Sequence, residues 1–127
     1  LMIGKTNRIT YRTVLTGADG KKANVEKTGR SVIFEIDGVK IGMAIQDADR
    51  DDLYGRRRLV HVASGLIIGD PLDDLIDAEK VRTGHAPSVT DAATITFERA
   101  LEKHGSAKML SVIRGAKVIN VPPKGRI

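Results

Sequence analysis

The sequence predicts an α+β fold in which an antiparallel β-sheet of four to five strands, connected as a meander, packs two to three helices on one face. Two observations predict this class. In the first half of the chain apolar residues alternate with polar ones, as in half-buried strands. In the second half they recur at the three- and four-residue spacing of amphipathic helices. The expected single domain spans 2–121, and 122–127 form a basic C-terminal tail.

The early strands follow from local patterns. The segment RITYRTVL predicts a strand with four residues on one face, namely Ile9, Tyr11, Thr13 and Leu15. After a turn rich in Gly and Asp, a short strand is expected over 23–27. In SVIFEIDGVKIGMAI, Asp37 and Gly38 join two alternating runs. A type I′ turn favours this pair because both of its central residues need a positive φ, so a β-hairpin is predicted.

The segment RLVHVASGLIIGD closes the predicted sheet. It reads as one strand, a break at Ser64 and Gly65, and then a short apolar strand. Because its apolar residues are nearly continuous, a central strand covered on both faces is expected.

Two helices are predicted next. PLDDLIDAEKV has apolar residues at helical spacing, with Pro71 suited to the first helical position and Asp70 to the cap. SVTDAATITFERALEKHG is the strongest helical segment. Ser88 is its expected cap, Asp91 occupies the capping-box position, and Gly105 is expected to end it.

In the last part of the chain the spacing of apolar residues predicts the secondary structure less clearly. Residues 106–114 fit a third helix or half of a hairpin, and the periodicity does not separate these alternatives. AKVINV, residues 116–121, predicts a final strand that ends at Pro122 and Pro123.

Charge is distributed unevenly along the chain. The formal net charge is +5; residues 1–30 hold seven Lys and Arg against two acids, and residues 105–127 hold five and no acid. If both ends fold onto one side, they form a positive surface that attracts phosphates. The alternative is an ordinary charge that maintains solubility.

The composition also limits the kinds of site and the cellular location expected for the protein. The chain has no cysteine, which excludes disulfides and cysteine-ligated metal sites. It has no apolar run near the roughly 18 residues that span a bilayer, and no secretory signal is visible, so a cytoplasmic protein without membrane contact is expected.

The segment QDADRDDLYGRRRLVH combines dense acids with three consecutive arginines. In a strand, Arg56 and Arg58 would share a face opposite to Arg57, and two guanidiniums on one face can hold adjacent phosphates. Alternatively, the arginines neutralise the preceding aspartates, and an acidic partner protein would use the same side chains. The predicted nucleic-acid-binding residues are Arg56, Arg57, Arg58, Lys5, Arg8, Arg12, Lys108, Arg114 and Lys117.

The aspartates of this segment resemble a calcium loop only in part. Asp47, Asp49 and Asp51 match the first three ligands of an EF-hand, but Asp52 replaces the glycine at position 6 and Arg58 replaces the bidentate glutamate at position 12. An EF-hand is therefore excluded. A looser magnesium or calcium site stays open, a charged connection between strands is favoured, and no cofactor is predicted.

Catalytic motifs are scarce. His61, His85 and His104 are far apart and lack metal-ligand spacing, and His61 fits a core histidine better than a base. The segment ERALEKHGSAKMLSVIRG resembles a helix-turn-helix, but His104 takes the place of the turn glycine and Gly105 comes one residue late. The alternative is two ordinary helices that cover a sheet.

The favoured function is therefore a small non-enzymatic protein that binds DNA or RNA mainly through the phosphate backbone. Phe34 and Phe97 are expected on the apolar core faces of their elements, which leaves only Tyr11 and Tyr54 free to stack on bases. Binding should therefore depend on phosphates and on salt. A protein–protein interaction or inhibitor module is the alternative, and an unrecognised metal-dependent hydrolase is the third hypothesis. A homodimer through an uncovered sheet edge stays open.

Overall fold

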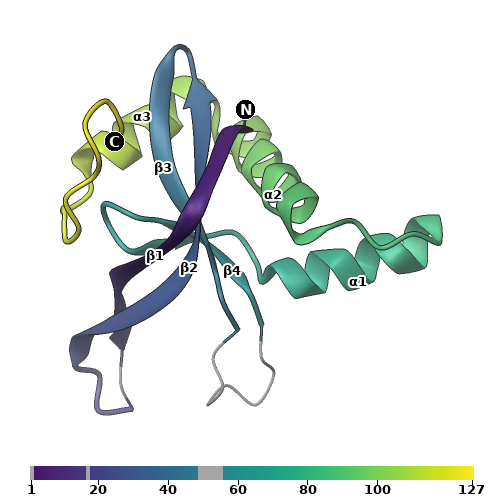
Figure 1. Ribbon diagram of the computed structural model, residues 1–127, viewed down its shortest axis with the longest axis horizontal. Coiled ribbons are helices and arrows are strands. Elements are labelled where there is room, and N and C mark those ends of the chain that lie inside the picture. The colour runs from purple at the N-terminus through teal and green to yellow at the C-terminus, as the bar shows by residue number, and fades with distance from the viewer. Residues whose placement is uncertain (1, 17, 49–55) are drawn as a thin grey trace.

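The structure of the protein, a computed structural model, describes residues 2–16, 18–48 and 56–127 (Figure 1). Within these residues five antiparallel strands form one sheet in the order of the sequence, and three helices follow, which confirms the predicted α+β meander. The strands are β1 Met2–Thr16, β2 Lys22–Ile36, β3 Val39–Gln46, β4 Arg58–His61 and β5 Leu66–Ile68. The helices are α1 Leu72–Thr83, α2 Val89–His104 and α3 Ser106–Gly115.

The first two strands are longer than their local patterns suggest. β2 is continuous over 15 residues, so the expected strand over 23–27 and the first strand of the hairpin are one strand. Its pairing with β1 runs from Met2 opposite Phe34 to Thr16 opposite Lys22, and this ladder holds the polar first half of β2 extended. The hairpin between β2 and β3 is confirmed, with φ of 49° at Asp37 and 79° at Gly38.

The second half of β2 lies between β1 and β3, but β3 pairs with β2 only as far as Gly29 opposite Gln46. The remaining parts of β1 and β2 therefore continue past β3 as a two-stranded ribbon, which extends toward the lower left of Figure 1. We call residues 8–16 and 22–30 the ribbon; its base, Gly29 and Arg30 of β2, still pairs with Gln46 and Ile45 of β3.

The helix starts differ in how they are capped. The Ser88 hydroxyl accepts a hydrogen bond from the Asp91 amide at 3.1 Å, as predicted for α2. The prediction that Asp70 caps α1 was wrong: Pro71 occupies the cap position and no side chain caps the helix. The Leu72 amide instead donates to the Arg57 carbonyl at 2.9 Å, so the chain before β4 satisfies the donor that a cap would serve.

The C-terminal part of the chain contains a third helix, and the strand predicted after it does not form. Residues 106–115 form helix α3. No strand forms over 116–121, because the amides of Ile119 and Asn120 both donate to the Ala63 carbonyl instead of alternating along a strand. The Asn120 side chain hydrogen bonds to both backbone groups of Arg12 and to the Val62 carbonyl, and so it links the edge strand β1 to the residues after β4.

The core lies between the sheet and the helices. Fully buried residues of β2, β3 and β4 meet α2 and α3, and the rings of Phe34 and Phe97 stack with centroids 4.2 Å apart. A smaller cluster of Tyr11, Ala44 and Val60 lies apart from this core. Because β4 has buried residues in both clusters, it is central and covered on both faces, as predicted, whereas β5 is an edge strand.

Candidate functional site

The consecutive arginines bind acids of α1. Only Arg58 belongs to β4, and the two residues before it reach the first turn of α1. The Arg57 guanidinium donates to Asp73 through Nε at 3.0 Å and Nη2 at 2.6 Å, and the Arg57 amide donates to the other carboxylate oxygen. Arg56 pairs with Asp74 at 3.1 Å. Two of the three guanidiniums are thus neutralised within the chain, by acids that lie after β5 in the sequence.

The Arg57–Asp73 pair makes stability depend on pH. Burial alone raises the pKa of Asp73, but the hydrogen bonds and the charge of Arg57 outweigh it and hold the pKa below its ordinary value. A depressed pKa gives stability that is present above the unfolded-state pKa, about 4, and is lost as the pH falls through the folded-state pKa.

We therefore predict that Asp73→Asn lowers the free energy of unfolding at pH 7 by about 1 kcal/mol, a value reduced for the partial exposure of both side chains. The difference from the unsubstituted protein should shrink as the pH falls below about 4, because Asp73 is then protonated in the unfolded chain and, at still lower pH, in the folded chain. Urea denaturation across pH measures it. A difference that is the same at pH 7 and pH 3 would show that the Asp73 charge is not involved.

The other predicted cations do not gather with the arginines. Lys108, Arg114 and Lys117 are exposed on and just after α3, which Figure 1 shows at the opposite end of the sheet from the start of β4. Arg8 forms an ion pair with Asp47. The backbone of Lys5 pairs with Val32 in the sheet, and its side chain lies outside the described residues. The structure thus does not bring the nine predicted residues onto one surface.

The exposed face of the ribbon does bring several cations together. In an antiparallel ladder directly opposed residues point to the same side. Arg8 lies opposite Arg30, Arg12 opposite Glu26, and Thr16 opposite Lys22, and those of these side chains that the structure describes are exposed. The opposite face carries Tyr11 and Thr13, which are buried. One face of the ribbon therefore displays four basic residues: Arg8, Arg12, Lys22 and Arg30.

Two of these residues, Lys22 and Arg30, are missing from the sequence-based set. The excess of positive charge in residues 1–30 indicates the right segment. It does not show which cations share a face, because that depends on the register of β1 against β2 across the turn.

The structure describes the aspartates of the charged segment only in part. Asp49, Asp51 and Asp52 lie outside the described residues, whereas Asp47 accepts a hydrogen bond from the Thr28 hydroxyl besides pairing with Arg8. Across the described ranges no three His, Cys, Asp or Glu side chains cluster as for a metal ion.

The connection between α2 and α3 is shorter than the turn of a helix-turn-helix. Gly105 alone separates α2 from α3, whereas a helix-turn-helix has a turn of three to four residues.

His61 is a buried core histidine. It is 3% exposed, and its Nδ1 lies 2.7 Å from the Ser64 hydroxyl oxygen. Burial lowers the pKa of His61, and a backbone contact with Ile127 opposes that shift. Ser64 is itself buried and accepts a hydrogen bond from the Leu66 amide, so this pair stabilises the turn between β4 and β5.

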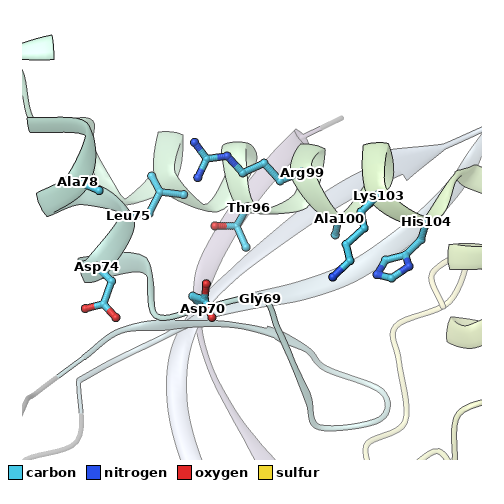
Figure 2. A pocket seen from close by; sticks show the side chains of 10 residues that line it. All are labelled: Gly69, Asp70, Asp74, Leu75, Ala78, Thr96, Arg99, Ala100, Lys103 and His104. Carbon is cyan, nitrogen blue, oxygen red and sulfur yellow. The ribbon is translucent and has the colours of Figure 1, made fainter. Parts of the chain in front are cut away.

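A groove lies between the β5 edge and the helices. Its wider part, a cavity of about 550 Å³, is bounded by α1, α2 and the residues after β5 (Figure 2). Figure 2 shows Lys103 and His104 extending from α2 toward the segment that carries Gly69 and Asp70. A second, apolar cavity of about 330 Å³ adjoins it between β5 and α3 and shares the residues Gly69, Ala100 and His104.

None of the helices in the described parts of the chain is long and apolar enough to cross a membrane. Comparison of the chain with protein-family models, with curated proteins and with solved structures finds no match in any of the three.

Proposed function

We propose that the protein binds nucleic acid, DNA or RNA, mainly through the phosphate backbone and with the exposed face of the ribbon. The observation that carries this proposal is the set of cations on that face. Arg12, Lys22 and Arg30 are exposed, and none of them has an ion-pair partner among the described residues. They differ in this from Arg56 and Arg57, whose charges are already matched by α1.

The pairing of Arg8 with Arg30 favours an anionic partner. Like charges directly opposite each other in an antiparallel pair destabilise it, since their Cβ atoms are only about 5 Å apart. In the structure Asp47 pairs with Arg8 and leaves Arg30 without a counter-charge within the described chain. A phosphate group next to Arg30 would supply that counter-charge through bidentate hydrogen bonds.

The shape and the neutral residues of the ribbon fit the same partner. A two-stranded β-ribbon is narrow enough to enter the major groove of B-DNA. Thr10 and Asn24 are exposed on the basic face, and hydroxyl and amide groups commonly donate to phosphate oxygens.

Base stacking has little part in this proposal. Tyr11, expected from the sequence to be free, is 4% exposed, and its hydroxyl donates to the Gln46 side chain at 3.0 Å. Tyr54, the other tyrosine, lies outside the described residues. The described part of the ribbon thus offers charge and hydrogen bonds rather than aromatic surfaces, which favours the phosphate backbone as the contact.

The test is the double substitution Arg12→Ala plus Arg30→Ala. We expect it to weaken binding to a 20-base-pair duplex about tenfold or more near 100 mM salt, and to lower the salt slope by about two. The free energy of unfolding should change by less than about 0.5 kcal/mol per site, because both side chains are exposed. Fluorescence anisotropy measures the affinity and urea denaturation measures the stability.

The matched control removes two charges from elsewhere. Lys80→Ala plus Arg82→Ala on α1 lowers the net charge equally but leaves the ribbon intact. If the control weakens binding as much as the ribbon variant, only the overall charge attracts the duplex and the ribbon is not the contact surface.

A further inference from the structure

β5 is an apolar edge strand. On one side it pairs with β4, and within the described chain no strand pairs with its other side. Leu66 is 50% exposed and Ile67 is 43% exposed. Proteins usually protect such edges with charged residues or proline, because an open edge offers backbone hydrogen bonds to another chain. The sequence of β5, Leu-Ile-Ile, contains neither.

The apolar cavity lies directly beside this edge. It is enclosed by Ile67 and Ile68 on the strand side and by Met109, Val112 and Ile113 on the α3 side. Val112 is 58% exposed although it borders this cavity. An extended chain paired with β5 would turn every second side chain toward the cavity, which is the geometry by which edge-strand peptide sites select their ligands.

The charges along the groove favour an acidic partner. Lys103, His104 and Lys108 border it from the helices, and none of them has an ion-pair partner among the described residues. The other charged residues of the groove are mostly engaged, since Asp74 pairs with Arg56 and Arg99 pairs with Glu79. Of the described residues that line the two cavities, Asp70 is the one acid without an ion-pair partner, against Lys103 and Lys108.

We propose that the groove between β5 and the corner of α2 and α3 binds an extended peptide segment of a partner protein. The segment pairs with β5 as an added strand, places apolar side chains against Val112 and Met109, and sets a carboxylate beside Lys103 and Lys108. The two sites use different residues, because the basic face of the ribbon lies on β1 and β2, whereas the groove lies beyond β5 at the other end of the strand order.

The probes are two pools of seven-residue peptides, in which Val or Ile alternates with Thr or Ser. One pool ends in Asp-Glu and the other ends in Lys-Arg. In ¹H–¹⁵N NMR spectra of the full chain we expect the acidic pool to shift the amides of Leu66 to Gly69 and those around Val112. The basic pool should bind at least about threefold more weakly. The absence of shifts with both pools at millimolar concentration overturns the proposal.

Two variants test the contacts. Val112→Asp should weaken the acidic pool about tenfold, and Lys103→Glu plus Lys108→Glu should reverse the preference between the pools. The control is Val81→Asp, an apolar residue of α1 that is 88% exposed and does not line the groove, which should leave binding unchanged. Equal binding by Val112→Asp and the unsubstituted chain overturns the proposal.

Two further outcomes separate this site from its alternatives. Sedimentation that shows a dimer lost on Ile67→Asp would make a second copy of the chain the occupant and contradict the peptide proposal. Val112→Asp should bind the DNA duplex as the unsubstituted protein does, so failure of the peptide site and failure of the ribbon are distinguished. A loss of duplex binding in that variant would show that the two surfaces are not separate.

Discussion

Replacement of Phe97 by alanine is expected to lower the free energy of unfolding by about 3–5 kcal/mol. Phe97 is fully buried on α2, and its ring stacks on that of Phe34 in β2 at an interplanar angle of 14°. Both rings belong to the main buried cluster, which joins the strands of the sheet to α2 and α3. Removing the ring loses the transfer free energy of its atoms and leaves a cavity that the neighbouring strands cannot fill.

Urea denaturation followed by circular dichroism measures this effect. Phe97→Leu retains most of the volume and should cost clearly less than Phe97→Ala. Val81→Ala, at a residue that is 88% exposed, should change stability by less than about 0.5 kcal/mol. A loss below about 1 kcal/mol for Phe97→Ala would contradict the packing of α2 on the sheet.

The second large effect is expected at Gly29, where the ribbon leaves the sheet. A Cβ atom at this position would lie 2.5 Å from the Ile45 carbonyl oxygen and 3.0 Å from the Gln46 Cα. Both are backbone atoms of β3, so they cannot rotate away as a side chain could. We expect Gly29→Ala to lower the free energy of unfolding by about 1–3 kcal/mol, because β2 and β3 must separate at the base of the ribbon.

Gly115→Ala provides the matched control, since it makes the same chemical change at the end of α3. Apart from its chain neighbours and the backbone of its own helix, no atom lies within 4 Å of a Cβ added there, and alanine is the better helix former. Gly115→Ala should therefore leave thermal stability unchanged or slightly higher. Equal stability of the two alanine variants would be inconsistent with the close approach of β3 to Gly29.

Features that depend on neighbouring residues could be predicted from the sequence. The Asp37-Gly38 turn requires two positive φ angles, and Ser88 caps α2 through an amide three residues away, so both signals are contained in a few residues. Phe34 and Phe97 were expected on the apolar faces of their elements for the same reason, and both are fully buried.

Features that depend on distant residues could not be predicted. Arg57 and Asp73 are 16 residues apart, and their pairing is decided by how α1 starts against the chain before β4. Asn120 holds Arg12 across 108 residues, which replaces the strand expected near the C-terminus. The basic face of the ribbon likewise depends on a register that a one-residue slip would invert, and composition does not determine that register.

The salt dependence of duplex binding tests the central proposal most directly. If Arg12, Lys22 and Arg30 each contact one phosphate, the logarithm of the association constant falls linearly with the logarithm of salt concentration, with a slope of about −3. Fluorescence anisotropy with a 20-base-pair duplex between about 50 and 200 mM salt measures this slope. An affinity that stays constant over this range, or no binding at the lowest salt, would contradict phosphate contact by the ribbon.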